Sequence, residues 1–186
     1  MLFPESRIII SLCDHSGAWS RPYLEAGYDV RRYDLQQGQD IRLLKFPGQI
    51  YGLLAAPPCT MFCIGANHLQ AKRTEAQMLD ALSIVDACYR LAAVSNPRFW
   101  AIENSAGQLP KWLGPPAYSF QPYWFGDGYR KLTHLWGKFD FPRQVPTLTI
   151  GKSGAIENAK SEAGSRMNNR SITPAGFARA FFEANQ

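Results

Sequence analysis

The chain has 186 residues, of which 46% are hydrophobic and 19% are charged. This length suits one domain with a real core, and the composition excludes a disordered chain. No apolar stretch approaches the roughly 20 residues that span a bilayer. Residues 1–6 lack the basic-then-apolar pattern of a signal peptide, so we expect a cytoplasmic protein. The net charge of +5 weakly favours a polyanionic partner.

The four cysteines, Cys13, Cys59, Cys63 and Cys88, are too few and too unevenly spaced for a disulfide scaffold. In a cytoplasmic protein they would stay reduced. Cys59 and Cys63 have the spacing of half a zinc site, but no second close Cys/His pair accompanies them. We therefore predict no metal.

The N-terminal part begins with a buried strand over residues 7–12, because Ile8-Ile9-Ile10 is a continuous β-branched run. A tight polar turn follows at residues 13–18. The pattern then predicts a short helix over 19–26, which Gly27 ends. A second strand over 29–33 closes at Asp34.

A third apolar run over residues 50–56 stops at a proline pair, which cannot continue a strand. From 69 to 94 the apolar residues recur at steps of three and four, which predicts a long helix. Residues 99–102 return as the next strand. This alternation predicts an α/β domain, a doubly wound, mostly parallel sheet with helices on both faces.

Beyond Gly107 the sequence becomes rich in proline and aromatic residues. Residues 123–125 and 133–136 are predicted as the final strands, for which an antiparallel arrangement is one option. The segment 139–167 is loop-like. A last helix is predicted to start at Pro174 with Thr173 as its cap, and to bury Phe177 and Phe181. We expect residues 1–186 to form a single domain.

Two polar motifs follow neighbouring predicted strands, Pro57-Pro58-Cys59 after one and Glu103-Asn104 after the next. Open α/β folds place their chemistry at this edge of the sheet, so a thiol and a carboxylate would face one pocket. Each motif alone is weak, since a cysteine after a strand is more often a small core residue and a loop acid is more often solvated. Together, in this order, they indicate a nucleophile and an acid.

The order of elements and motifs resembles the DNA (cytosine-5) methyltransferase family, especially its short phage and prophage members. The turn Ser11–Trp19 looks like the cofactor turn of that family, and Asp34 looks like the acid that holds the ribose of S-adenosylmethionine. Gln39-Asp40-Ile41 resembles the segment that contacts adenine. Pro57-Pro58-Cys59 is similar to the loop with the catalytic thiol, and Glu103-Asn104 to the paired acid and amide.

The resemblance implies a Rossmann-like methyltransferase fold with S-adenosylmethionine as cofactor. The cofactor-binding residues it implies are Cys13, Ser16, Gly17, Trp19, Asp34, Leu35, Asp40, Ile41 and Pro57. The catalytic residues it implies are Cys59, Glu103 and Asn104, with Arg130 or Lys131 near the target base.

The implied chemistry explains why a thiol and a carboxylic acid belong together. Carbon 5 of cytosine is a poor nucleophile, so the Cys59 thiolate must first add at carbon 6. Glu103 would neutralise the charge that builds at N3, provided that burial raises its pKa.

Several residues keep a structural alternative. Asp34 could cap the next helix, and Asp40 could be a turn residue bonded to its own backbone. Arg130 and Lys131 could simply cover the surface with their stems. The cofactor turn also departs from the family, because His15 stands where a glycine is common and Cys13 where an aromatic residue often stacks on adenine.

We expect double-stranded DNA as the partner, in a bacterium or a phage-infected cell. The segment 139–167 shows no element that would read bases in a groove, so we expect low sequence specificity or a partner protein that supplies recognition. Two alternatives stay open. One is a degenerate methyltransferase fold that binds nucleic acid or protein, and the other is an enzyme that acts on RNA or on a free cytosine nucleotide.

Overall fold

The structure is a computed structural model that describes residues 7–45, 48–64, 73–147 and 172–186. Strands and helices alternate through its first half. In chain order the elements, with η for a 3-10 helix, are β1 (Ile8–Leu12), α1 (Arg21–Glu25), β2 (Asp29–Tyr33), η1 (Leu35–Gln37), η2 (Ile41–Leu43), β3 (Gly52–Ala55), α2 (Glu75–Ser95), β4 (Phe99–Ser105), α3 (Pro110–Leu113), β5 (Tyr118–Phe120), η4 (Pro122–Phe125), β6 (Thr133–Lys138) and α6 (Ala175–Ala184).

The strands form a six-stranded sheet in the order β2-β1-β3-β4-β6-β5. The first four in this order are parallel, whereas β6 runs antiparallel to both of its neighbours. The chain moves from β1 outward to β2 and then crosses to β3 on the other side of β1. The strand order therefore reverses between β1 and β3, in the middle of the four parallel strands.

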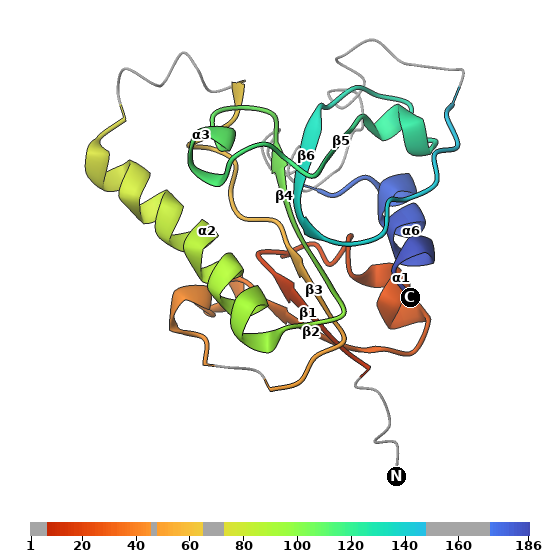
Figure 1. The fold of residues 1–186 in the computed structure, drawn as a ribbon, viewed down its shortest axis with the longest axis horizontal. Helices are drawn as coiled ribbons and strands as arrows, with labels where there is room; N and C mark the ends of the chain where they lie inside the picture. Colours follow the sequence, from red (N-terminus) through yellow and green to blue (C-terminus); the bar gives the residue numbers. More distant parts are fainter. Residues whose placement is uncertain (1–6, 46–47, 65–72, 148–171) are drawn as a thin grey trace.

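Helices cover both faces of the sheet, α2 on one face and α1 with α6 on the other (Figure 1). Successive residues of a strand point to opposite faces. Thus Ile9 and Leu54 pack with the aromatic residues of α1 and α6, while Ile10 and Leu53 pack against α2. Burial on both faces explains the continuous apolar runs. The predicted α/β class, with a mostly parallel sheet, is confirmed.

The long helix α2 begins at a capping box. The Thr74 side chain accepts a hydrogen bond from the Gln77 N–H, and the Gln77 side chain accepts one from the Thr74 N–H. This arrangement satisfies two N–H groups that a helix start otherwise leaves free. The helix ends at Asn96, which adopts the left-handed conformation with φ of 41°. Of the predicted helix over 69–94, residues 69–72 lie outside the described residues.

The prediction of a strand over residues 123–125 is wrong. These residues belong to the 3-10 helix η4, which Pro122 begins with its fixed φ. The strand lies just before it, as β5, and pairs with β6. The second prediction, a strand from residue 133, is confirmed, and it is antiparallel. Residues 139–147 form neither helix nor strand, and 148–167 lie outside the described residues.

The predicted cap of the last helix is also wrong, because Pro174 rather than Thr173 occupies that position and offers no side-chain hydrogen bond. Asp127, far away in the sequence, supplies the acceptor instead: its Oδ2 accepts a hydrogen bond of 3.1 Å from the Gly176 N–H. Burial raises the pKa of the Asp127 carboxyl, and hydrogen bonds from the start of α6 lower it. A distant carboxylate therefore performs the capping.

Replacing Gly176 by alanine is expected to destabilise the fold. Such a change inside a helix ordinarily stabilises by up to about 1 kcal/mol. Here the added Cβ would lie 2.0 Å from the Phe125 carbonyl oxygen and 2.8 Å from Asp127 Oδ2, so α6 must shift. We expect a loss of about 1–3 kcal/mol in the free energy of unfolding, measured by denaturant titration. The exposed neighbour Ala175, changed to serine, should stay within about 0.5 kcal/mol of wild type.

Candidate active site

Polar segments follow the carboxyl ends of the parallel strands, all at one edge of the sheet. The turn 13–20 follows β1, Asp34 follows β2, and Pro57-Pro58-Cys59 lies just beyond β3. The central strand β4 carries Glu103 near its own carboxyl end. Ligands of open α/β sheets bind outside this edge, where the strand order reverses. In this fold that place is between the turn after β1 and the segment after β3.

Cys59 begins a single tight turn. The N–H groups of Phe62 and Cys63 both donate to the Cys59 carbonyl, at 2.9 Å each. The proline pair separates this turn from β3, since neither proline has an N–H to continue the strand. The Cys59 side chain is half-buried. We call residues 57–64 the Cys59 loop.

The Cys59 loop is fixed to β4 and to the segment after it. The Asn104 side-chain amide donates to the Pro57 carbonyl at 2.9 Å, and the Gln108 N–H donates to the Phe62 carbonyl at 2.8 Å. Between them lies Gly107, where a Cβ would stand 1.9 Å from the Phe62 carbonyl oxygen. Asn104 thus acts on the loop that carries Cys59, and Gly107 permits the close approach of the two segments.

Arg73 holds the same loop from the side of α2. Its guanidinium donates to the carbonyl oxygens of Thr60 and Met61, at 2.8 and 2.5 Å. These are carbonyl groups of the turn that follows Cys59. Sequence reasoning gave Arg73 no role, because only the folded chain brings it to the loop.

Glu103 forms a buried ion pair with Lys131. The predicted strand ended at residue 102, but β4 continues to Ser105 and carries Glu103 within it. The Glu103 residue is 6% exposed, and its Oε1 lies 3.7 Å from Lys131 Nζ. This oxygen accepts no hydrogen bond from the described residues. A buried acidic side chain without a partner is costly, and Lys131 provides that partner for Glu103.

Glu103 and Lys131 both affect the pKa of the Cys59 thiol, so the three side chains form one group. Burial raises the pKa of Cys59, and the neighbouring Cys63 raises it further. A hydrogen bond with the Ser105 side chain and the positive charge of Lys131 lower it, while Glu103 raises it. The resting side chain is therefore chiefly the thiol, and its conversion to the thiolate depends on these neighbours.

Arg130 and Lys131, the two basic residues predicted near the target base, have different surroundings in the structure. Lys131 reaches Glu103, and its backbone N–H is held by the Gln121 side chain at 2.9 Å. Arg130 is exposed and lies over the Tyr123 ring, with its guanidinium carbon 5.9 Å from the ring centroid. Only Lys131 therefore joins the thiol and the acid. Arg130 instead covers an aromatic surface, as the structural alternative expected.

The turn after β1 is organised by Asp14. Its buried carboxylate accepts hydrogen bonds from the hydroxyls of Ser11, Ser16 and Ser20, at 2.9, 3.3 and 2.8 Å. Asp14 is not among the predicted site residues, although three serines around one acid are a usable signal in the sequence. Ser16, a predicted cofactor residue, is exposed at this turn.

Two other predicted residues of this turn direct their side chains inward. The Cys13 side chain packs against the core on the α2 side, where it raises the pKa of the buried Cys88 thiol. The Trp19 indole is fully buried against Phe177 and Phe181 of α6. Trp19 is thus a core residue in this structure, and neither side chain faces the edge of the sheet.

Gly17 has the left-handed conformation, with φ of 67°. A Cβ at this position would lie 2.4 Å from the guanidinium of Arg32 on β2. Glycine therefore lets the turn bend and lets β2 approach it.

Asp34 and Leu35 lie at the carboxyl end of β2. Asp34 is 8% exposed, and its Oδ1 accepts a hydrogen bond of 2.8 Å from the Gln36 N–H. The capping alternative is thus present in the structure. Leu35 next to it is 66% exposed. A carboxylate beside an exposed apolar side chain suits a ligand with one polar and one flat apolar part.

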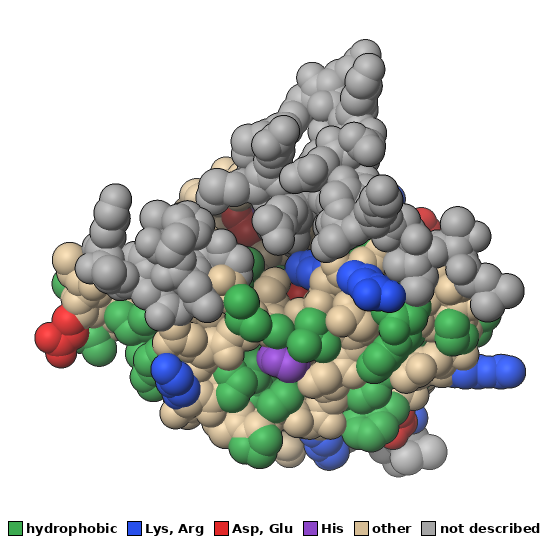
Figure 2. Space-filling model, turned by 90° about the horizontal axis from the view of Figure 1, so that it is seen from above, with side chains coloured by type: hydrophobic (Ala, Val, Ile, Leu, Met, Phe, Trp, Pro, Cys, Tyr) green, Lys and Arg blue, Asp and Glu red, His purple; other side chains and the backbone are tan. Residues whose placement is uncertain are grey.

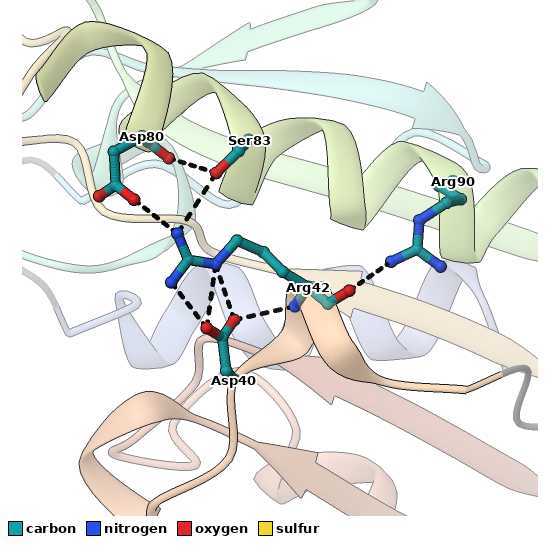
Figure 3. Close-up of polar contacts among 5 residues, drawn as sticks. All are labelled: Asp40, Arg42, Asp80, Ser83 and Arg90. Carbon is teal, nitrogen blue, oxygen red and sulfur yellow. Dashed lines mark hydrogen bonds and ion pairs between the residues drawn. The ribbon is translucent and has the colours of Figure 1, made fainter. Parts of the chain in front are cut away.

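Asp40 and Ile41 are engaged within the fold. Both carboxylate oxygens of Asp40 bind the Arg42 guanidinium, at 2.9 and 2.6 Å, which lowers the pKa of Asp40 (Figure 3). Arg42 also reaches Asp80 of α2 at 2.5 Å. The Ile41 side chain is buried in the core. Asp40 therefore has a structural role, because it holds the Arg42 side chain that joins η2 to α2.

The described residues contain neither a cluster of metal ligands nor a membrane-spanning helix. Within residues 7–45, 48–64, 73–147 and 172–186, no three His, Cys, Asp or Glu side chains gather as a metal site. None of the helices in these ranges is both long and apolar enough to cross a bilayer.

Comparison with known proteins gives a likeness of fold. No family model and no curated protein sequence matches the chain. A solved E. coli structure, provisionally assigned as a DNA modification methyltransferase encoded within a prophage, matches with a TM-score of 0.52 and 16% sequence identity. The match covers 76% of this chain and 51% of the other, so the chain spans about half the length of that protein. The two share a fold.

Proposed function

We propose that this chain, which shares its fold with a methyltransferase, transfers a methyl group from S-adenosylmethionine to carbon 5 of cytosine in DNA. The observation that carries the proposal is the group formed by Cys59, Glu103 and Lys131 at the carboxyl edge of the sheet. A nucleophile, an acid and a cation in one half-buried site suit addition to a ring that gains negative charge.

The residues at the ends of β1, β2 and β3 suit the cofactor. Asp34 would bind the ribose hydroxyls, and the exposed Leu35 would pack on the adenine ring. The turn that Asp14 organises would lie beside the methionine part, with Pro57 opposite it. When bound, S-adenosylmethionine supplies an electrophilic methyl group. Cys13, Trp19 and Asp40 are not part of this proposal, because their side chains are engaged in the fold.

The described side chains divide the work on the base. Cys59 attacks carbon 6 as the thiolate, and its sulfur forms the new bond. Glu103 takes up the proton that the Cys59 thiol loses and supplies it at N3, so the ring electrons can be directed to carbon 5. Lys131 stabilises the glutamate and the thiolate before attack. After methylation, solvent water takes the carbon 5 proton, the restored double bond expels the thiolate, and the N3 proton returns to Glu103.

A base in a duplex must leave the stack to reach a half-buried thiol, so base flipping is part of the proposal. Figure 2 looks down on this edge and shows basic side chains near its middle, with hydrophobic side chains around them. Arg130, exposed and stacked on Tyr123, suits a contact with phosphate. Such contacts carry no sequence information, which agrees with low specificity or with recognition by a partner protein.

Nucleoside mass spectrometry tests the proposal. The protein is expressed in a bacterial host that lacks cytosine methylation, and the digested DNA is analysed. We expect 5-methylcytosine. Purified protein is then given duplex DNA, RNA and deoxycytidine monophosphate with labelled cofactor. Preference for RNA or the mononucleotide would replace DNA as the substrate, and no transfer to any of them would favour the degenerate binding module.

Changing Asp34 to asparagine is expected to weaken cofactor binding about 10-fold, since the variant keeps the cap on Gln36 but loses the charged acceptor. Isothermal titration with S-adenosylmethionine measures the Kd. Asp29, exposed at the opposite end of β2, provides the control as Asp29→Asn. Equal Kd values for the wild type and Asp34→Asn would remove Asp34 from the site.

A further inference from the structure

The carbonyl groups of the turn that Cys59 begins are bonded from three directions. The Cys59 carbonyl accepts hydrogen bonds from N–H groups of the turn itself, and the Phe62 carbonyl accepts one from the backbone after β4. The two carbonyl groups between them, those of Thr60 and Met61, accept hydrogen bonds from the Arg73 guanidinium, at 2.8 and 2.5 Å. The middle of the turn is therefore held by a side chain, whereas its two ends are held by the backbone.

An arginine is well suited to this place in the fold. A helical turn leaves carbonyl groups at its carboxyl end without a backbone partner, and basic side chains commonly bind them. The guanidinium presents its N–H groups as a rigid fork, whereas the ammonium of lysine is a compact point charge. In this structure Nη1 of Arg73 donates to Met61 and Nη2 donates to Thr60, so each terminal nitrogen serves one carbonyl.

The backbone of Arg73 is attached to the longest helix of the described chain. Arg73 directly precedes Thr74, the cap of α2, and the capping box between Thr74 and Gln77 fixes the start of that helix. The helix has 21 residues and packs on the sheet through its buried face. Arg73 therefore links the Cys59 loop to a rigid element that does not itself carry the thiol or the acid.

We propose that Arg73 is a positioning residue, which keeps the Cys59 sulfur in place for attack by holding the turn that carries it. The proposal rests on the proposed function for its catalytic meaning, whereas the contact with the loop does not depend on any substrate. The obvious alternative for an arginine beside a DNA site is a contact with phosphate. Both terminal nitrogens of Arg73 already donate to the Cys59 loop, so the structure favours positioning.

The kinetic test compares kcat with KM. In Arg73→Ala we expect kcat to fall about 10–100-fold, because a small displacement of a reacting group is costly. KM for DNA and its salt dependence should stay unchanged. Arg73→Lys keeps the charge but not the fork, so it should not restore kcat. Millimolar guanidinium chloride should restore part of the kcat of Arg73→Ala, whereas sodium chloride at the same concentration should not. Arg90→Ala is the matched control, since Arg90 is exposed further along α2 and donates to a carbonyl away from the loop, at 3.2 Å.

Hydrogen exchange tests the contact without DNA or cofactor. The N–H groups of Phe62 and Cys63 donate to the Cys59 carbonyl, so their exchange reports the turn. It should be faster in Arg73→Ala and, if that variant folds poorly, in Arg73→Lys, but unchanged in Arg90→Ala. Unchanged exchange in the Arg73 variants would overturn the proposal. A raised KM with a shallower salt dependence and full rescue by lysine would also overturn it, because this pattern marks a phosphate contact. Faster exchange in a protein whose wild type methylates nothing would fail the proposed function and keep the hold of Arg73 on the loop.

Discussion

Replacing Cys59 by alanine is expected to lower methyl transfer by about 10⁴-fold or more. The thiolate forms the bond that makes carbon 5 reactive. The other two side chains of the group, Glu103 and Lys131, have no thiol that could replace it. Cofactor affinity should stay within about twofold of wild type, because the thiol serves the reaction rather than binding. Transfer of labelled methyl groups and calorimetry measure the two quantities.

Cys63→Ala is the matched control. Cys63 lies one turn after Cys59, is also half-buried, and donates its N–H to the Cys59 carbonyl. Its side chain lies near Cys59 and raises the pKa of that thiol. The control should therefore retain transfer within a few-fold of wild type. Retained turnover in Cys59→Ala, or equal losses in both variants, would contradict the assignment of the nucleophile.

Replacing Glu103 by glutamine is expected to change two properties in opposite directions. Methyl transfer should fall by about 10²–10⁴-fold, because the amide cannot give the proton that N3 needs. Alkylation of Cys59 should become faster at neutral pH. The negative charge of Glu103 raises the pKa of the thiol, so its removal lowers that pKa and increases the thiolate fraction.

These opposite effects separate chemistry from unfolding. A merely damaged site would lower transfer without a downward shift of the pH midpoint of alkylation. Glu25→Gln, at the exposed end of α1, removes the same charge far from the site and should change neither quantity. If Glu103→Gln retained transfer within about threefold, the acid would have to be another group.

Three of the parallel strands, β1, β3 and β4, could be predicted because they are buried on both faces. Ile8-Ile9-Ile10 and the run ending at Ala56 are apolar without interruption, which only a central strand requires. The antiparallel half lacks this signal. Its strands are short, and η4 has the aromatic composition of a strand although Pro122 starts a 3-10 helix there.

The position of the two motifs could be predicted as well, since residues after parallel strands meet at one edge of the sheet. Their partners could not. Arg73 reaches the Cys59 loop and Asp127 caps α6 only through tertiary contacts between distant segments. The choice of Lys131 over Arg130 also depends on the fold, because neighbouring residues at the start of β6 take different directions.

Asp34 and Asp40 look alike in the sequence, but the side chains around them differ. Both accept a hydrogen bond from the backbone N–H two residues later. Arg42 then occupies both oxygens of Asp40, whereas Asp34 stands beside the exposed Leu35. A sequence pattern marks both as turn residues, and only the neighbouring side chains distinguish them.

The most direct test of the central claim is covalent trapping on duplex DNA that contains 5-fluorocytosine. Fluorine at carbon 5 cannot leave as a proton does, so the bond between enzyme and base should persist once the methyl group has been transferred. With S-adenosylmethionine present, we expect a complex that survives denaturation, with the modified base on the Cys59 peptide, from wild type and Cys63→Ala but not from Cys59→Ala. An adduct on another residue, or methylation of ordinary DNA without any trapped complex, would contradict the account.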